Sequence, residues 1–258
     1  MTAQRASGAG GPAEGAVGVI PARFEATRFP GKPLAPIAGV PMIRRVWEGA
    51  RTAKRLRRVI VATDDARIAD ACAGFGAEAV LTSPEHPTGT DRIAEVAARL
   101  SEPVIVNVQG DEPLIEGFVI DAAVDALAAD ASAPMATVAH PADPDALADP
   151  NRVKVVTDRR GRALYFSRSA IPFQREDAPP VKVLQHVGLY AYRREFLLRF
   201  VGLAQTPAER AESLEQLRAL EHGHPIQVAV VEGWSSAAVD VPADVARVEA
   251  RLRALGRC

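Results

Sequence analysis

The chain has 258 residues, of which 31 are lysine or arginine and 32 are aspartate or glutamate, giving a formal net charge of -1. This balance argues against a broad nucleic-acid or membrane-surface partner. The two cysteines, Cys72 and Cys258, lie far apart, so neither a disulfide framework nor a zinc cluster is indicated. Residues 1–16 lack the apolar core of a signal peptide, and no later segment is long enough to cross a bilayer. We therefore expect a soluble, cytoplasmic protein with a disordered tail at 1–16.

Strand-like and helix-like segments alternate through the first half of the chain. Such alternation predicts βαβ units and a three-layer α/β/α fold with a mostly parallel, Rossmann-like sheet. Ligands bind such sheets at the carboxyl ends of the strands. The expected elements are the strand Val17–Pro21, the helix Pro41–Ala53, the strand Arg58–Thr63, the helix Ala66–Gly74, the strand Ala77–Leu81, a helix from about Asp91 to Leu100, the strand Val104–Val108 and a helix from about Gly117 to Ala129.

The pattern changes after Met135. Two strand-like runs flank Asp158–Gly161, which predicts a hairpin, and another strand follows at 186–193. We expect an α/β core at 17–134 and a smaller mixed α+β subdomain at 135–205, which covers the crevice and is a candidate dimerisation surface and lid. Residues 206–258 then return to the core. Their expected elements are the helix Pro207–His222, the strand Ile226–Val231 and a helix from about Pro242 to Leu255.

The segment 19–43 (VIPARFEATRFPGKPLAPIAGVPMI) joins a strand to a helix through a loop that carries Arg23, Arg28 and Lys32. Pro30, Gly31 and Pro33 stiffen this loop. Fixed guanidinium groups bind phosphate oxygens in pairs, and backbone N–H groups near a glycine add a positive field. The loop is therefore a candidate polyphosphate receptor. Its alternative interpretation is a solvated surface loop.

A second candidate site is the run 107–115 (NVQGDEPLI), which follows an apolar strand. A carboxylate at the end of a buried strand can hold Mg²⁺, which prefers oxygen ligands and often shares them with substrate phosphates. The alternative is a turn with two exposed acids. That alternative explains the glycine and proline but not Gln109 beside Asp111 and Glu112.

The loop 82–92 (TSPEHPTGTDR) is a candidate for selecting a base, because a stiff loop can present backbone groups to a hydrogen-bonding edge. Thr90 is the expected N-cap of the following helix. His86 has no second metal ligand at a suitable spacing, so we interpret it as a loop residue. Asp64 and Asp65 lie between a strand and a helix and are interpreted as structural.

Seven motifs in order, from residue 20 to residue 220, resemble the 3-deoxy-manno-octulosonate (Kdo) cytidylyltransferase family, also called CMP-Kdo synthetases. The resemblance covers nearly everything except the N-terminal tail. The motifs are PAR-x-x-x-TR-x-PGKPL, VATDD-x-RI, TSP-x-HP-[ST]-GTDR, NVQGDEPLI, FSRS-x-IP, HVGLYAYR and LEQLR-x-L. CMP-sialic acid synthetases share the general loop arrangement but lack the QGDEP run.

The resemblance implies a nucleotidyltransferase fold in which the core at 17–134 binds the nucleotide. It implies an enzyme that uses CTP, Kdo and the cofactor Mg²⁺ for lipopolysaccharide biosynthesis, and a homodimer. The implied catalytic residues are Arg23, Lys32 and Asp111, and the implied metal ligands are Asp111 and Asp240. The implied nucleotide-binding residues are Arg23, Arg28, Lys32, Thr88, Gly89, Asp91, Arg92 and Gln109. The implied sugar-binding residues are Gln109, Arg168, His186, Tyr190, Glu215 and Gln216.

Four positions depart from the family pattern. Ala26 stands where a serine is usual, Ala170 replaces a common proline, and Val241 and Ala243 replace the threonine and glutamate of an Asp-Thr-Pro-Glu-Asp run. Asp240 is retained, but groups around a metal ligand tune metal affinity. These departures leave a modified substrate, such as an 8-amino analogue of Kdo, as an alternative.

Two further hypotheses remain from other classes. A nucleotide-sugar glycosyltransferase would need an Asp-x-Asp-type metal motif, which we do not find. A non-catalytic nucleotide-binding protein is disfavoured because Arg23, Lys32, Asp111 and Asp240 are all present. Release of pyrophosphate from CTP would separate the three hypotheses.

Overall fold

A computed structural model of the chain describes residues 15–25, 29–177 and 179–257. Of the expected tail at 1–16, residues 1–14 lie outside this part, while Ala16 already belongs to the first strand, β1 (Ala16–Ala22). Arg28 and Ala26 also lie outside the described residues.

The first half of the chain forms the predicted βαβ units. Their order confirms the alternation that the sequence indicates, with bounds shifted by up to three residues. The elements are α1 (Met42–Ala50), β4 (Leu56–Thr63), α2 (Ala66–Gly74), β5 (Glu78–Leu81), α3 (Gly89–Ala98), β6 (Val104–Asn107) and α4 (Gly117–Ala129). A short 3-10 turn, η1 (Lys32–Leu34), and a small ribbon of β2 (Pro36–Ile37) and β3 (Val40–Pro41) lie between β1 and α1.

The second half adds strands to the same sheet. Its elements are β7 (Met135–Pro141), η2 (Pro144–Ala146), β8 (Lys154–Thr157), β9 (Ala163–Ser167), β10 (Leu184–Arg193), α5 (Arg194–Phe200), α6 (Pro207–Glu212), α7 (Gln216–Glu221), β11 (Ile226–Val230) and α8 (Ala243–Ala254). The helix α5 was not predicted. The expected hairpin is confirmed, because β8 and β9 pair in antiparallel fashion around Asp158–Gly161.

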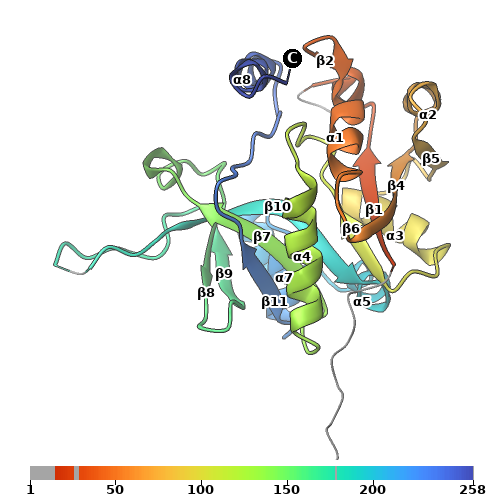
Figure 1. Ribbon diagram of the computed structural model, residues 1–258. Coiled ribbons are helices and arrows are strands. Elements are labelled where there is room, and N and C mark those ends of the chain that lie inside the picture. Colours follow the sequence, from red (N-terminus) through yellow and green to blue (C-terminus); the bar gives the residue numbers. More distant parts are fainter. Residues whose placement is uncertain (1–14, 26–28, 178, 258) are drawn as a thin grey trace, which may run out of the picture.

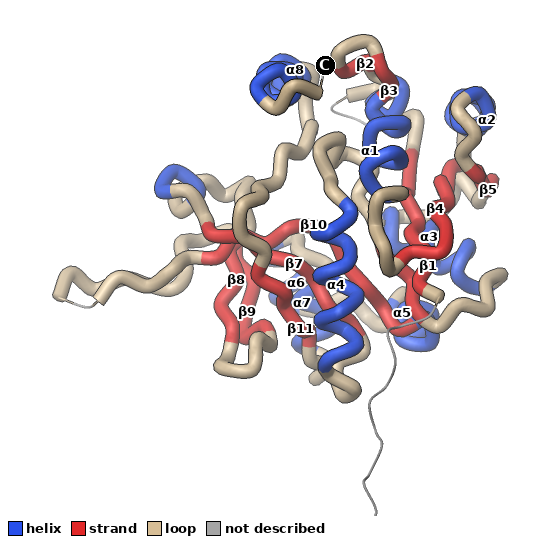
Figure 2. Tube along the Cα trace, in the orientation of Figure 1, coloured by secondary structure: helices blue, strands red, loops and turns tan. Residues whose placement is uncertain are grey.

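Within the described residues the central sheet has nine strands, with the path β11-β7-β10-β6-β1-β4-β5 and the hairpin β8–β9 attached to β10. Along this path β10 runs antiparallel to both neighbours and the other adjacent pairs are parallel, so the sheet is mostly parallel as predicted. Figure 2 shows that the strands of residues 135–205 continue the sheet of the core. The division into a core and a smaller subdomain stays a prediction.

Helices cover both faces of the sheet, which gives the three layers (Figure 1). Alternate residues of β1 separate into two buried clusters: Ile20 packs with α1, α2 and α4, whereas Val17 and Val19 pack with α3, α5 and α7. This is the period-2 alternation of a strand buried on both faces. A third buried cluster joins α8 to the β2–α1 region through Ile37, Val239 and Val248.

One expected helix is broken. The prediction of a continuous helix over Pro207–His222 is wrong, because α6 ends at Glu212 and α7 begins at Gln216. Ser213 adopts a left-handed conformation with φ of 51°. Arg168 supplies the physical reason, since its side chain donates to the carbonyl oxygens of Glu212 (2.7 Å) and Ser213 (3.4 Å) in place of helical N–H groups.

None of the helices in the described part of the chain combines the length and the apolar composition that a membrane span requires.

Candidate functional site

Three loops converge at the carboxyl ends of neighbouring strands, around Pro21. A Cβ atom added to Gly110, in the loop after β6, would lie 2.8 Å from the carbonyl oxygen of Pro21. One added to Gly89, the first residue of α3 and part of the run 82–92, would lie 3.3 Å from the Pro21 ring. Glycine at 110 therefore permits a close approach that a side chain would block. The three sequence candidates thus meet at one edge of the sheet, as expected from the rule for parallel sheets.

Lys32 joins the first loop to the acidic loop. Its Nζ lies 3.0 Å from Asp111 Oδ2 and 3.0 Å from the carbonyl oxygen of Val239. The backbone N–H of Val239 donates to the carbonyl oxygen of Asp111 at 2.9 Å. Residues from three distant parts of the sequence therefore share one cluster, and Asp240 follows directly after Val239.

Arg23 contacts the loop that we interpret as base-selecting. Its guanidinium donates to the carbonyl oxygen of His86. The His86 ring is held in turn, because Nε2 lies 2.6 Å from Glu95 Oε2 on α3. Partial burial, together with the positive charge of Arg92, lowers the pKa of Arg23. A partly buried guanidinium at the carboxyl ends of the strands is a suitable receptor for phosphate.

The start of α3 differs in one detail from the prediction. Thr88, and not Thr90, is the N-cap, and it forms a capping box with Asp91. Thr88 Oγ1 donates to Asp91 Oδ2 at 2.6 Å, and the Asp91 N–H donates back to Thr88 Oγ1 at 3.2 Å. These two predicted nucleotide-binding residues therefore shape the helix N-terminus, whose first N–H groups carry a partial positive charge.

Arg92 is fully buried under the loop 82–92. Its guanidinium contacts Asp64 Oδ2 at 2.6 Å, the Thr82 hydroxyl and the carbonyl oxygen of Ser83. The interpretation of Asp64 as structural agrees with this pairing, and Asp65 is the N-cap of α2. Arg92 thus holds the base-selecting loop from below, while its predicted contact with the nucleotide stays a prediction.

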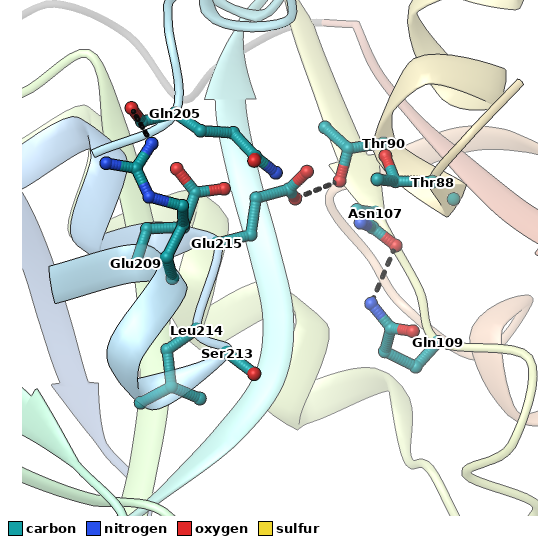
Figure 3. A pocket seen from close by; sticks show the side chains of 11 residues that line it. Thr88, Thr90, Asn107, Gln109, Gln205, Glu209, Ser213, Leu214 and Glu215 are labelled. Atoms are coloured by element: carbon teal, nitrogen blue, oxygen red, sulfur yellow. Dashed lines mark hydrogen bonds between the residues drawn. The ribbon is translucent and has the colours of Figure 1, made fainter. Parts of the chain in front are cut away.

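A cavity of about 740 Å³ opens beside the Lys32–Asp111 cluster. Most of the predicted metal and sugar ligands line it: Gln109, Asp111, His186, Tyr190, Glu215, Gln216 and Asp240. A neighbouring cavity of about 400 Å³ is lined by Thr88, Gly89, Gln109 and Glu215, among others. Figure 3 shows Glu215 reaching across this second cavity to Thr90, while Gln109 contacts Asn107 on the side of Thr90.

His186 lies in the wall of the larger cavity as a neutral imidazole. Thr137 Oγ1 donates to the carbonyl oxygen of Leu189 at 2.7 Å, so it accepts a hydrogen from His186 Nε2, 2.9 Å away. Burial lowers the pKa of His186 to about 3. The Nδ1 atom is therefore left as a hydrogen-bond acceptor.

Glu215 and Gln216 owe their positions to the break between α6 and α7. Glu215 Oε2 accepts a 2.5 Å hydrogen bond from Thr90, and burial raises the pKa of the Glu215 carboxyl. Gln216 is buried, and its Nε2 has no hydrogen-bond partner in the described structure. An unpaired buried amide that lines a cavity is a strong candidate for a ligand contact.

Arg168 does not join this group. It is not among the described residues that line the two cavities. Its guanidinium instead donates to the backbone carbonyl oxygens of Glu212, Ser213 and Pro150. It could contact a sugar carboxylate only by leaving these carbonyls.

The residues of the larger cavity suit a magnesium ion. Asp111 and Asp240 offer carboxylate oxygens to the same space, and the Lys32 ammonium already places a positive charge at Asp111. Within the described residues no cluster of three or more His, Cys, Asp or Glu side chains is arranged to hold a metal. Mg²⁺ commonly takes one or two protein carboxylates and completes its shell with phosphate oxygens and water. The altered run after Asp240 is ordered by Asp244, whose Oδ2 accepts from the N–H groups of Asp240 (2.9 Å) and Val241 (3.0 Å).

Sequence reasoning did not single out several polar residues of the larger cavity. They include His140, Arg152, Arg247 and Arg251. Glu112, which the sequence analysis places beside Asp111 in the acidic run, also lines this cavity. The others come from segments whose patterns are typical of ordinary strands, loops and helices.

Comparison with known proteins agrees with this geometry. The model of a family described as "Cytidylyltransferase" matches residues 17–226. The chain therefore belongs to the cytidylyltransferase family. Relatives named 3-deoxy-manno-octulosonate cytidylyltransferase include one from Syntrophotalea carbinolica, 53% identical over 92% of this chain and 98% of the relative. Another, from Myxococcus xanthus, is 53% identical over 93% of this chain and 97% of the relative. Within its family the chain belongs with these 3-deoxy-manno-octulosonate cytidylyltransferases.

Solved structures give the same result. A CMP:2-keto-3-deoxy-manno-octonic acid synthetase complexed with CTP superimposes with a TM-score of 0.88 at 40% identity, covering 94% of this chain and all of the other. A cytidylyltransferase from Leptospira borgpetersenii has a TM-score of 0.63 at 17% identity, covering 93% of this chain and 87% of the other, and shares the fold. The family membership favours the cytidylyltransferase hypothesis over the glycosyltransferase alternative.

Proposed function

We propose that this protein transfers the cytidylyl group of CTP to Kdo, giving CMP-Kdo and pyrophosphate. The anomeric 2-hydroxyl of the sugar would attack the α-phosphorus in line, and the bond to the β-phosphate oxygen would break. The observation that carries the proposal is the meeting of Lys32, Asp111 and the Asp240 segment at the carboxyl ends of the strands, in a chain of this family. Such transfers depend on positioning and charge neutralisation.

Arg23, Arg28 and Lys32 would bind the triphosphate and stabilise the charge that develops on the leaving pyrophosphate. Arg23 lies against the loop 82–92, and the smaller cavity beside the α3 N-terminus is the proposed site of the cytidine. The backbone N–H groups there, with Thr88, Gly89, Asp91 and Gln109 around them, supply donors and acceptors for a base and a ribose.

Mg²⁺ would be held by Asp111 and Asp240. When bound, the ion would neutralise phosphate charge and make the sugar hydroxyl more acidic. Lys32, 3.0 Å from Asp111 Oδ2, would hold the same carboxylate in place and contribute its own charge to the phosphates.

The sugar would occupy the larger cavity. Gln109, Tyr190, Glu215 and Gln216 offer donors and acceptors for its hydroxyl groups, and neutral His186 offers an acceptor at Nδ1. Arg168 stays a proposed partner of the sugar carboxylate.

We further propose a cytoplasmic homodimer. Apolar side chains exposed on β9 and on the loop that follows it support a contact between copies: Leu164, Tyr165, Phe173 and Val181, with Phe173 87% exposed. Light scattering of the purified protein tests the oligomeric state.

The test of function is an incubation of the protein with CTP, Mg²⁺ and Kdo, in which pyrophosphate release is followed. A parallel arm with the 8-amino analogue of Kdo tests the alternative substrate. D111N serves as the control that retains shape but loses the proposed metal ligand. Absence of pyrophosphate with every 3-deoxy-2-ulosonic acid would overturn the proposal and favour a non-catalytic nucleotide-binding protein.

A further inference from the structure

The segment between β11 and α8 delivers Asp240 to the site, but it contains neither helix nor strand. In Figure 1 it crosses from the end of β11 at the sheet to α8 near β2. A segment without sheet partners is positioned by its individual contacts. The placement of Asp240 therefore depends on a small number of hydrogen bonds and on the buried residues beside it, Ala237 and Val239.

Lys32, Asp244, Arg247 and Arg251 supply some of those hydrogen bonds, and a further set connects the segment to the loop after β6. Trp234 Nε1 donates to the carbonyl oxygen of Leu114 at 3.3 Å, and the Val239 N–H donates to the carbonyl oxygen of Asp111 at 2.9 Å. Between these two contacts lies the Glu112 carboxylate. One of its oxygens accepts from the Ser236 hydroxyl, and the other accepts from the Ala237 N–H at 3.1 Å.

Glu112 is only 5% exposed, although it lies next to Asp111 and borders the larger cavity. Both of its oxygens are engaged by the 236–237 backbone and side chain, so a role as metal ligand does not follow from its position beside Asp111. Burial of a carboxyl group costs free energy unless its oxygens accept hydrogen bonds, and both oxygens of Glu112 do so.

We propose that Glu112 is a positioning residue that fastens residues 236–240 to the loop 109–112 and thereby sets the spacing between Asp111 and Asp240. This inference rests on the magnesium site proposed above. It assigns different roles to the two acids of the run: Asp111 would hold the ion, whereas Glu112 holds the segment that carries the other proposed ligand, Asp240.

Substitution of Glu112 by glutamine or by alanine separates the effect of its hydrogen bonds from the effect of its charge. In Glu112→Gln the amide oxygen can accept from the Ala237 N–H while the amide nitrogen donates to the Ser236 hydroxyl, so both contacts survive without a charge. In Glu112→Ala both contacts are lost. Ser236→Ala removes one of the two and is available if Glu112→Ala folds poorly. The matched control is Glu116→Ala, which removes a half-exposed acid four residues along the same loop.

The measurement is calorimetric binding of CTP with and without Mg²⁺, without any turnover. We expect the apparent Mg²⁺ affinity to fall roughly 10- to 100-fold in Glu112→Ala, the usual effect of losing a group that orients a metal ligand. Ser236→Ala should lie between Glu112→Ala and the wild type. Glu112→Gln and Glu116→Ala should stay within about threefold of the wild type, and CTP binding without Mg²⁺ should change little in all four variants. Glu112→Ala combined with Asp240→Asn should be no worse than Asp240→Asn alone.

Three results would overturn the inference. If Glu112→Gln is as impaired as Glu112→Ala, the charge and not the fastening is what matters. If Asp240→Asn weakens the Mg²⁺ dependence but neither Glu112→Ala nor Ser236→Ala does, the proposed metal site stands and this inference fails alone. If Asp111→Asn and Asp240→Asn both leave the Mg²⁺ dependence unchanged, the metal site fails and the inference fails with it.

Discussion

Lys32 Nζ and Asp111 Oδ2 lie 3.0 Å apart although 79 residues separate them in the sequence. The contact joins the loop after β1 to the loop after β6, two strands that are neighbours in the sheet. Both side chains are partly buried, so water screens their interaction less than it would at an open surface. The pair therefore keeps a positive and a negative group ready at the place where phosphates and a metal ion would meet.

Replacing Lys32 by methionine should lower kcat by at least about 100-fold, because a charge that stabilises the transition state is lost while the side-chain length is kept. Steady-state kinetics of pyrophosphate release would measure this. Lys54→Met is the matched control, since Lys54 is exposed in the loop between α1 and β4. Equal rates for the two variants would remove Lys32 from the catalytic set.

Glu95→Ala should impair the reaction through Arg23. Glu95 accepts from His86 Nε2 and from the Ser83 N–H, and the carbonyl oxygen of His86 accepts from the Arg23 guanidinium. Loss of Glu95 should loosen this loop and reduce kcat/KM for CTP roughly 10-fold, about the effect of a misplaced positioning group.

The double variant Glu95→Ala with Arg23→Ala tests the connection. Because the two changes would break one chain of contacts, the double variant should be little worse than Arg23→Ala alone. Glu85→Ala, at an exposed position of the same loop, is the control. Fully additive losses would mean that Glu95 acts independently of Arg23.

His186 should make the protein less stable in acid. Its pKa is about 3 in the folded protein, below the ordinary value of 6.5, so the unfolded chain binds the proton more readily. The stabilisation is complete above pH 6.5 and is lost as the pH falls toward 3. In urea unfolding, the free energy of unfolding should therefore fall between pH 7 and pH 5 by about 2 kcal/mol more in the wild type than in His186→Gln. Parallel pH profiles for the two proteins would contradict a buried neutral imidazole.

Gln216→Leu should weaken sugar binding without harming the fold. The Nε2 of Gln216 is buried without a partner in the described structure, so an apolar replacement of similar size removes a cost from the free protein. We expect KM for Kdo to rise roughly 10-fold, the cost of one lost hydrogen bond, with CTP affinity unchanged and thermal stability equal or higher. Ser213→Ala, in the adjacent turn, controls for general disturbance. An unchanged KM for Kdo would take Gln216 out of the sugar site.

Sequence patterns located the βαβ units and the loops of the site because these features are local. Apolar alternation places a strand such as β1, and Gly117 opens α4 where the pattern predicts it. Asp65, which we interpret as structural, is the N-cap of α2. The N-cap at Thr88 was missed by two residues because Thr88 and Thr90 both precede the same apolar helix pattern, and only the contact with Asp91 separates them.

The amino-acid sequence by itself determined the strand-and-helix order, the family and the three loops, since each of these depends on residues that are close together in the chain. Only the tertiary structure decided which groups meet. Glu112 and Ser236 come together because α8 packs against the β2–α1 region and brings its preceding segment along. The expected helix breaks at Ser213 because Arg168, the residue after β9, donates to the carbonyl oxygens of Glu212 and Ser213. Such contacts depend on packing between elements far apart in the chain, and no local pattern records them.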